Sequence, residues 1–434
     1  MDRSDSLLTR LLRYAQTSSS VVATAAKFAS EEFLGISLDH FQQAQALKAV
    51  LGNLKGPVMK VAQFLATVPG ALPEAYAKEF LALQTNAPAM GEGFVRRRMV
   101  GELGGEWEKK FQSFELTSSY AASLGQVHKA TLLSGETVAC KLQYPSMESI
   151  VEADVSQLKF VLSVYETFNK SLQTSDIFAE IKEKLFDELD YVKESKNISL
   201  YRSIFANDPD IHVPTVYDDY TTTRLLTMDW FEGQSVLNYQ GASLDMRNRI
   251  GQLLFRAWYY PLYHHGVIHG DPHPGNYHVN KDKGIHLLDF GCVRFFSTEF
   301  IKGVVDLYQS LKNNDRDRMV QAYEAWGFTN LTGAVIDVMG SWAKLLFEPL
   351  LDDRVRPIQE RIIGWDVASK IHEELNKLGG IKPPREFVFM DRATVGIGSV
   401  LFHLRAELNW HRLFEELIEN FSRVHEIKCQ RVRV

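Results

Sequence analysis

The sequence predicts a mixed α+β fold of two lobes that follow an all-helical N-terminal extension. Three observations support this prediction: helical periodicity over residues 1–110, several strand-like runs between residues 111 and 229, and helical periodicity again from residue 244 onward. The expected domains are therefore the extension at 1–110, a strand-rich lobe at 111–229 with a helical insert at 146–170, and a helical lobe with a C-terminal extension at 230–434.

The extension contains one well-patterned helix between residues 38 and 66, where apolar residues recur every three or four positions. Lys60 and Gln63 fall on the opposite face of this helix. Periodicity alone favours a solvated polar surface for both residues, because any surface helix shows polar side chains opposite its apolar stripe. Proline and glycine at 69–70 end this helix, and a second helix is expected at 73–84.

Strand chemistry begins near Phe111, and the runs at 124–133 and 137–142 are joined by a tight turn at 134–136. Small residues precede the first of these two runs and let backbone N–H groups approach phosphate oxygens. The candidate phosphate-binding residues of this loop are Ala121, Ala122, Ser123, Gly125 and Gln126.

Lys141 lies within an apolar strand, where its ammonium group needs either solvent or a partner. Glu188 falls on the apolar stripe of a helix that begins near Ser175. We interpret the two as the strand lysine and helix glutamate that hold the α- and β-phosphates in kinase folds. The alternative is that Glu188 faces solvent at the edge of the stripe.

Two further strands, at 213–217 and 224–229, precede the connection between the lobes. Backbone groups of Asp229 and Phe231 are expected to meet an adenine edge, with Met228 behind it. The last helix of the chain is expected at 391–419.

The stretch from residue 264 to residue 291 carries the strongest chemical signal. Asp271 is followed by Asn276 and then by Asp289, in the order and spacing that kinase-like folds use for a catalytic base and two magnesium ligands. Residues 277–288 form an apolar hairpin pattern that would bring Asn276 and Asp289 together. The stretch therefore predicts binding of ATP and Mg²⁺. A zinc site built from the local histidines is disfavoured, because no cysteine is interleaved and no His-x-x-x-His pair with a Glu occurs.

Composition excludes several other classes of protein. The chain has 434 residues, 45% of them hydrophobic and 24% charged, with a net charge of −6, so a nucleic-acid partner is not expected. Its three cysteines are too few for a disulfide framework and favour a reducing compartment. No apolar run approaches the ~20 residues that span a bilayer. We expect a cytoplasmic or peripheral membrane protein, an organelle not being excluded, and the leucine-bearing start of the chain fits either a membrane-surface helix or one docked on its own protein.

With these residues in place, the sequence resembles the UbiB/ADCK family of atypical kinases from about residue 47 to residue 410. The matching blocks are KVAQ at 60–63 with LPE at 72–74 and LQTNAP at 83–88, AASLGQVH at 121–128, ELDY at 188–191, and DPHPGN at 271–276 with DFG at 289–291. The first two blocks are specific to that family, and the last is shared with protein and aminoglycoside kinases.

The resemblance implies an ATP-binding, protein-kinase-like fold in which an alanine-rich loop replaces the glycine-rich loop. It also implies that the helix carrying Lys60 and Gln63 is a functional lid over the active site, which reverses the interpretation from periodicity. Family members are associated with ubiquinone or related isoprenoid-quinone biosynthesis and act as ATPases near membranes. A quinone precursor, a lipid ligand and a membrane surface are thus implied partners.

The sequence departs from the family pattern at three positions without losing a catalytic group: Ala62 replaces a glycine, only two alanines follow Tyr120, and Cys140 precedes the lysine. We expect an atypical kinase or ATPase with Asp271 as the base, Asn276 and Asp289 at magnesium, and Lys141 oriented by Glu188. Two alternatives stay open: a small-molecule phosphotransferase, and a non-catalytic scaffold in which ATP selects a conformation.

Overall fold

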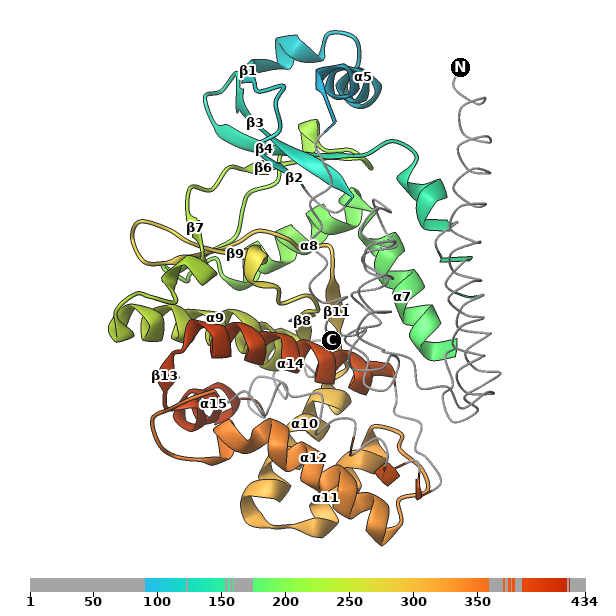
Figure 1. Cartoon of the computed structure of the whole chain (residues 1–434), viewed down its shortest axis with the longest axis vertical. Helices are drawn as coiled ribbons and strands as arrows, with labels where there is room; N and C mark the ends of the chain where they lie inside the picture. The colour runs from blue at the N-terminus through green and yellow to red at the C-terminus, as the bar shows by residue number, and fades with distance from the viewer. Residues whose placement is uncertain are drawn as a thin grey trace, which may run out of the picture. The chain divides into compact units, whose positions relative to one another are not determined.

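The computed structural model describes residues 90–121, 124–152, 175–358 and 385–419, with isolated residues between these ranges. Residues 1–89 of the expected N-terminal extension, which include Lys60 and Gln63, lie outside the described residues, as does most of the expected helical insert at 146–170. The described chain is a mixed α+β structure, as the sequence predicted (Figure 1). It divides into two units, one formed by Met1–Gly101, Glu115–His128 and Lys141–Leu189, the other by Glu102–Phe114, Lys129–Cys140 and Asp190–Val434.

The first sheet combines four strands from residues 111–143 with one strand from residues 225–229. Its order is β1-β3-β4-β6, and β2 pairs with β3 in addition. The strands are β1 (Phe111–Phe114), β2 (Tyr120–Ala121), β3 (Gly125–Leu132), β4 (Thr137–Gln143) and β6 (Leu225–Asp229). The predicted turn between β3 and β4 is confirmed, and Gly135 adopts a φ of 101° there, a backbone conformation that a glycine adopts without steric cost.

Three helices precede or separate these strands in the sequence. They are α5 (Glu92–Leu103), α7 (Ser175–Asp187) and α8 (Tyr191–Ile204), with a short 3₁₀ turn at Trp107–Lys110. Helix α8 begins at Asp190, whose carboxylate accepts the backbone N–H of Lys193, as an N-cap residue does. The predicted helix start near Ser175 is confirmed. The strand expected at 213–217 is reduced to an isolated antiparallel bridge between Val216 and Met228 of β6.

The second unit contains a four-stranded sheet of order β5-β10-β9-β7 and a two-stranded sheet of β8 and β11. Their bounds are β7 (Gln234–Ser235), β8 (Val267–His269), β9 (Tyr277–Val279), β10 (Ile285–Leu287) and β11 (Val293–Phe295). The long helix α9 (Leu244–His265) begins at the N-cap Ser243 and ends at Gly266, whose φ of 69° closes the helix and leads directly into β8.

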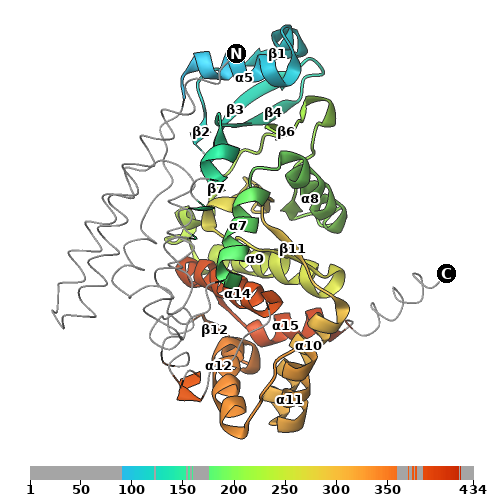
Figure 2. The same ribbon diagram turned by 90° about the vertical axis from the view of Figure 1, so that its right-hand side faces the viewer.

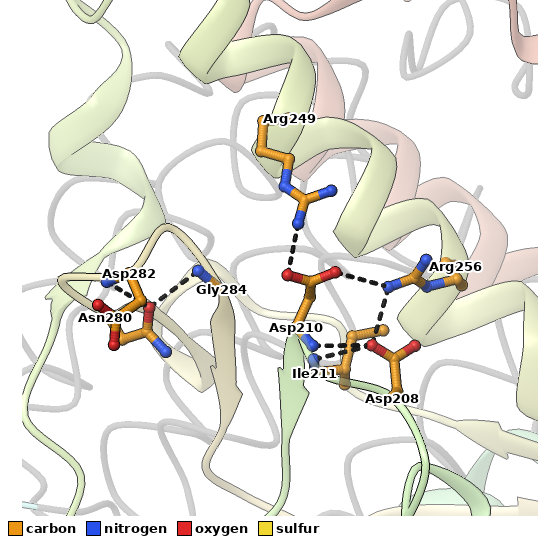
Figure 3. Close-up of polar contacts among 8 residues, drawn as sticks. All are labelled: Asp208, Asp210, Ile211, Arg249, Arg256, Asn280, Asp282 and Gly284. Atoms are coloured by element: carbon orange, nitrogen blue, oxygen red, sulfur yellow. Dashed lines mark hydrogen bonds and ion pairs between the residues drawn. The ribbon is translucent and has the colours of Figure 1, made fainter.

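Ion pairs attach β5 to α9 (Figure 3). Nη2 of Arg256 lies 2.9 Å from Oδ1 of Asp208 and 3.6 Å from Oδ2 of Asp210, and Arg249 contacts the second carboxylate at 2.5 Å. These groups are partly exposed, so each pair contributes little stability. Their effect is to orient the start of β5, which pairs in parallel with β10.

The remaining helices follow the stretch at 264–291 in sequence (Figure 2). They are α10 (Thr298–Asn313), α11 (Arg316–Ala325), α12 (Gly333–Leu351), α14 (Arg385–Leu404) and α15 (Trp410–Glu419), with the short strands β12 (Arg356–Pro357) and β13 (Glu407–Leu408). The single helix expected at 391–419 is wrong. Arg405 has a φ of 55°, so the chain leaves the helix there and forms β13 before α15 begins.

No helix within the described ranges is both long enough and apolar enough to cross a membrane.

Candidate active site

The β9–β10 hairpin places Asn276 and Asp289 at the same end of two paired strands. Leu287 lies opposite Tyr277, and the backbone N–H of Leu288 donates to the carbonyl of Asn276 at 3.1 Å. Because Asn276 immediately precedes β9 and Asp289 follows Leu288, both side chains leave the backbone where the hairpin opens. The predicted proximity of the two segments is confirmed.

The turn at the other end of the hairpin is held by Asn280. Its Oδ1 accepts the backbone N–H groups of Asp282 at 3.0 Å and Gly284 at 2.8 Å (Figure 3). Lys283 takes a φ of 66° in this turn. A side chain that mimics a backbone acceptor is the usual reason for asparagine in a tight turn, and here it sets the register that aligns Asn276 with Asp289.

The loop after β8 presents Asp271 beside Asn276. Nδ2 of Asn276 donates to the backbone carbonyl of Asp271 at 3.0 Å, which orients the amide so that Oδ1 points to the other side. Asp271 and Asn276 are both half-buried. The loop therefore carries one carboxylate and one oriented amide oxygen, close to the segment of Asp289.

His269 connects the Asp271 loop to the Asp289 segment. Its Nδ1 accepts the backbone N–H of Asp271 at 3.3 Å, and its Nε2–H donates to the backbone carbonyl of Asp289. In this pattern Nε2 is the donor and Nδ1 is the acceptor. The ring is 6% exposed, so it is a buried bridge between two segments that are 20 residues apart in sequence.

Close packing at Gly270 also holds the Asp271 loop near the segment after Asp289. The N–H of Gly270 donates to the carbonyl of Cys292 at 2.8 Å, and a Cβ added at Gly270 would lie 2.8 Å from Sγ of Cys292. Only glycine lets the strand before Asp271 approach the strand after Asp289 this closely.

Helix α8 holds the segment after Asp289. Nδ2 of Asn197 donates to the carbonyl of Phe290 at 2.9 Å, and the ring of Phe290 packs 5.2 Å from the ring of Tyr201. The sequence analysis missed Asn197 and the bridging role of His269. Asn197 lies within no recognisable spacing pattern, because its partner is brought close only by folding. His269 stands two residues before Asp271, in the His-x-Asp spacing of the kinase catalytic loop, which could have singled it out.

The end of β6 and the segment that follows it carry the expected adenine-facing residues. Met228 is buried, and the carboxylate of Asp229 accepts the N–H of Thr215 at 2.7 Å and the hydroxyl of Tyr217 at 2.9 Å. The ring of Phe231 lies against the ring of His286, with centroids 4.0 Å apart. The backbone path of this segment is therefore firmly held, and its contact with adenine stays a prediction.

In the first unit, Gln126 is fully buried within a polar network. Its Oε1 accepts the N–H of Met90 at 2.7 Å, and its Nε2 donates to the carbonyl of Met90 at 3.1 Å. The same nitrogen lies 2.9 Å from Nε2 of His128. Gln126 therefore fastens the segment before α5 to the sheet, so any effect on a nucleotide would act through the position of this segment.

The rest of the alanine-rich loop is described only in part. Ala121 pairs with Gln126 across β2 and β3, and Gly125 begins β3 in a buried position. Ala122 and Ser123 lie outside the described residues.

Lys141 lies on β4 and is half-buried, and Glu188 lies just after the end of α7. Gln143, two residues along the strand from Lys141, donates through Nε2 to the carbonyl of Leu189 at 3.0 Å. This bond ties the strand of Lys141 to the residue next to Glu188. A pairing of the two side chains stays a prediction.

The residues at the hairpin fit a magnesium ion better than zinc. Mg²⁺ is usually held by one or two protein oxygens together with substrate phosphates and water, and Asn276 and Asp289 supply oxygen donors of that kind. No three His, Cys, Asp or Glu side chains in the described part of the chain form a metal-ligand group. The histidines of this stretch have other partners: His264 stacks on Tyr260, and His273 accepts the N–H of Gly275.

Similarity to known proteins identifies the family of this chain. Residues 82–323 match the ABC1 atypical kinase-like domain. The chain belongs to this family. It is similar to the uncharacterized protein sll1770 of a Synechocystis strain, with 29% identity over 81% of this chain and 60% of that protein. It is 30% identical to Protein ACTIVITY OF BC1 COMPLEX KINASE 7, chloroplastic, of Arabidopsis thaliana over 80% of this chain and 50% of the other.

A third relative is Atypical kinase COQ8, mitochondrial, of Saccharomyces cerevisiae, with 27% identity over 84% of this chain and 74% of that protein. Among solved structures, the complex of Rv3197 with erythromycin from Mycobacterium tuberculosis aligns with a TM-score of 0.61 and 27% identity, covering 88% of this chain and 97% of that one. The chain spans about half to three-fifths of the first two relatives. The resemblance to the UbiB/ADCK atypical kinases is thus confirmed at the level of the ABC1 family.

Replacing Gln126 should lower the stability of this protein. Gln126→Leu removes two partly buried hydrogen bonds to the backbone of Met90, which should lower the free energy of unfolding by about 2 kcal/mol. Denaturant unfolding measures the change. Gln112→Leu, at an exposed position of β1, is the matched control. Equal midpoints for both variants would contradict the role assigned to Gln126.

His286 should make the stability of the protein depend on pH. It is 7% exposed and lies opposite His212 and His278 in the sheet. Burial, followed by repulsion from His212 and His278, lowers the pKa of His286 to about 4. Because the unfolded chain binds this proton near pH 6.5 and the folded chain does not, stability is present above that pH and falls as the pH drops toward 4.

The expected loss from this one group between pH 7 and pH 5 is about 2 kcal/mol. Urea unfolding at both pH values measures it. His286→Phe keeps a ring against Phe231 but cannot titrate, so its pH dependence should be flatter than that of the wild type by the same amount. Parallel curves for the two proteins would show that His286 does not titrate as described.

Proposed function

We propose that this chain binds ATP with Mg²⁺ and cleaves the γ-phosphate, as an atypical kinase or ATPase that serves ubiquinone or other isoprenoid-lipid metabolism. One observation carries the enzymatic part. The buried His269 joins the Asp271 loop to the backbone of Asp289, while Asn276 is hydrogen-bonded to the same loop. The groups that phosphoryl transfer needs are thus held by one network rather than by independent loops.

Each side chain has a distinct role in this proposal. Asp271 lies beside the acceptor and accepts its proton, since a carboxylate at this point of the loop serves as the base in kinase-like sites. Asn276 and Asp289 hold the metal through Oδ1 and the carboxylate, respectively. When bound, Mg²⁺ neutralises charge that develops on the phosphate oxygens. Lys141, oriented by Glu188, binds the α- and β-phosphates, and Asp229 and Phe231 receive adenine through their backbone groups.

The lipid-related part of the proposal rests on the family resemblance. Lys60 and Gln63 would act as a lid that excludes protein substrates, which favours water or a small acceptor. The names of the plant and yeast relatives place those proteins in chloroplasts and mitochondria. From the family resemblance, we propose a peripheral membrane location for this chain.

The proposal is tested by magnesium-dependent phosphate release from ATP by the purified protein, with and without vesicles that contain anionic lipid. We expect release that requires Mg²⁺ and increases with the vesicles. Nucleotide binding without turnover in any of these conditions would favour the non-catalytic scaffold.

A small-molecule phosphotransferase is the second candidate. The solved structure with erythromycin is a complex with a small molecule that carries several hydroxyl groups, which keeps this candidate open. It predicts that labelled γ-phosphate appears on an organic acceptor in proportion to the ADP formed. Mass spectrometry of the products distinguishes this outcome from release to water.

A further inference from the structure

The segment at 230–235, which we call the connector, is fastened to the hairpin that carries Asn276 and Asp289. Its last two residues, Gln234 and Ser235, form β7, which pairs antiparallel with β9 of that hairpin. The connector, β9 and β10 all belong to the second unit. One hydrogen-bonded sheet therefore joins the connector to the strands that lead to the predicted metal ligands.

Gly233 lets the connector lie directly on β9. A Cβ added at Gly233 would lie 2.8 Å from the carbonyl oxygen of Val279 and 3.1 Å from Cβ of His278. The first of these atoms is backbone within a paired strand, so it cannot turn aside as the end of a flexible side chain can. Any larger residue at this position therefore pushes the connector away from the hairpin.

A ring contact fixes the middle of the connector. The ring of Phe231 lies against the ring of His286 on β10, with centroids 4.0 Å apart and an angle of 31° between the ring planes. His286 is buried and has His212 and His278 as its neighbours on the two adjacent strands. Phe231 thus rests on a side chain that the sheet holds in place, and its backbone is positioned by the hairpin.

The start of the connector already uses its backbone donors within the protein. The N–H of Asp229 donates to the carbonyl of Thr215 at 3.0 Å, and the N–H of Trp230 donates to the carbonyl of Thr137 at 3.0 Å. The next backbone donor along the chain is the N–H of Phe231. A base at the connector would therefore meet a donor whose position depends on the contacts of Phe231 and Gly233 with the hairpin.

A donor in a fixed position distinguishes adenine from guanine. Adenine presents a ring-nitrogen acceptor beside an amino donor on this edge, whereas guanine presents a ring N–H beside a carbonyl acceptor, so the pattern is inverted. A rigid donor pairs with the first and meets a second donor in the other, and the unpaired groups cost affinity. A donor that can shift loses this discrimination.

We propose that Gly233 and His286 are positioning residues for base selectivity, which make the site accept adenine and reject guanine. They contact neither the base nor the metal. They act by fixing the N–H of Phe231 relative to the hairpin of Asn276 and Asp289. The inference rests on the proposed function in one respect, namely that a nucleotide binds at the connector.

The first test compares kcat/KM for ATP and for GTP, both with Mg²⁺, in the full chain. The wild type should favour ATP by at least about 10-fold, the effect of one hydrogen bond. Gly233→Ala should reduce this preference to less than about threefold through a higher KM for ATP, with kcat nearly unchanged. Gly241→Ala is the matched control, because an added Cβ there has no atom within 4 Å, and it should keep the wild-type preference.

The second test replaces the ring beneath Phe231. His286→Leu should lose the preference for ATP as Gly233→Ala does, whereas His286→Phe keeps a ring in contact with Phe231 and should retain it. A loss of stability alone would lower turnover of both nucleotides equally and leave their ratio unchanged. The ratio therefore separates positioning from a general effect on folding.

An unchanged ratio in both Gly233→Ala and His286→Leu overturns the proposal, as does a wild type without preference for ATP. Should Gly233→Ala fail to fold, the two His286 variants decide. If no protein turns over, equilibrium dialysis with Mg²⁺ and labelled ATP or GTP gives the ratio of Kd values instead. A selective wild type with unselective variants would then support the positioning role and refute the proposed catalysis. A wild type that binds neither nucleotide would refute both.

Discussion

Asp289→Asn is expected to lower magnesium-dependent ATP turnover at least about 100-fold, because it removes a negative charge from the metal site. The substitution keeps the size and planarity of the side chain. Oδ1 of Asp289 accepts the N–H of Gly291 at 3.0 Å, and the asparagine oxygen can make the same bond. The local backbone should therefore remain as it is, so the loss reports on charge rather than on folding. Phosphate release over a range of Mg²⁺ concentrations measures it.

Asp282→Asn is the matched control for this experiment. Asp282 lies in the exposed turn of the same hairpin, at the end opposite to Asp289. The control should turn over ATP like the wild type. If Asp289→Asn also retained its turnover, the assignment of a magnesium site to this end of the hairpin would be wrong.

His269→Phe is expected to reduce kcat by about 10- to 100-fold with a smaller change in KM for ATP. Phenylalanine fills the same buried space but can neither accept the N–H of Asp271 nor donate to the carbonyl of Asp289. Without this bridge the two catalytic segments lose their fixed separation, and misplaced groups cost more in the transition state than in binding. Steady-state kinetics measure both parameters.

His269→Gln provides the test that separates positioning from packing. Glutamine can donate and accept, so it should restore part of kcat if the hydrogen bonds matter. His403→Phe, at an exposed position of α14, should have no effect. Equal kcat values for His269→Phe and the wild type would exclude His269 as a positioning residue.

Much of the catalytic segment was predictable from the sequence because its geometry is local. Asn276 and Asp289 are joined by a short hairpin whose strands and turn are encoded by alternating apolar residues and by Asn280. Their meeting thus depends only on neighbouring residues. The turn at Gly135 was predictable for the same reason, and so was the start of α7.

Predictions failed where local preference competed with long-range packing. The apolar periodicity across 391–419 gave no sign of the break at Arg405, which lets β13 pair with β12 some 50 residues earlier in the chain. For Gln126, small neighbouring residues indicated a phosphate loop, which stays a prediction. Its hydrogen bonds to the backbone of Met90, at a sequence separation of 36 residues, could not be predicted because only folding brings the two together.

The family resemblance and the mixed α+β class were predictable from the sequence, because motif blocks and strand or helix patterns are local. Asp271, Asn276 and Asp289 stay the predicted site residues. Only folding shows that His269 bridges the Asp271 loop and the Asp289 segment, and that Asn197 holds Phe290 from 93 residues away. The physical reason is that hydrogen bonds between distant segments depend on how whole elements pack, and no local pattern records that packing.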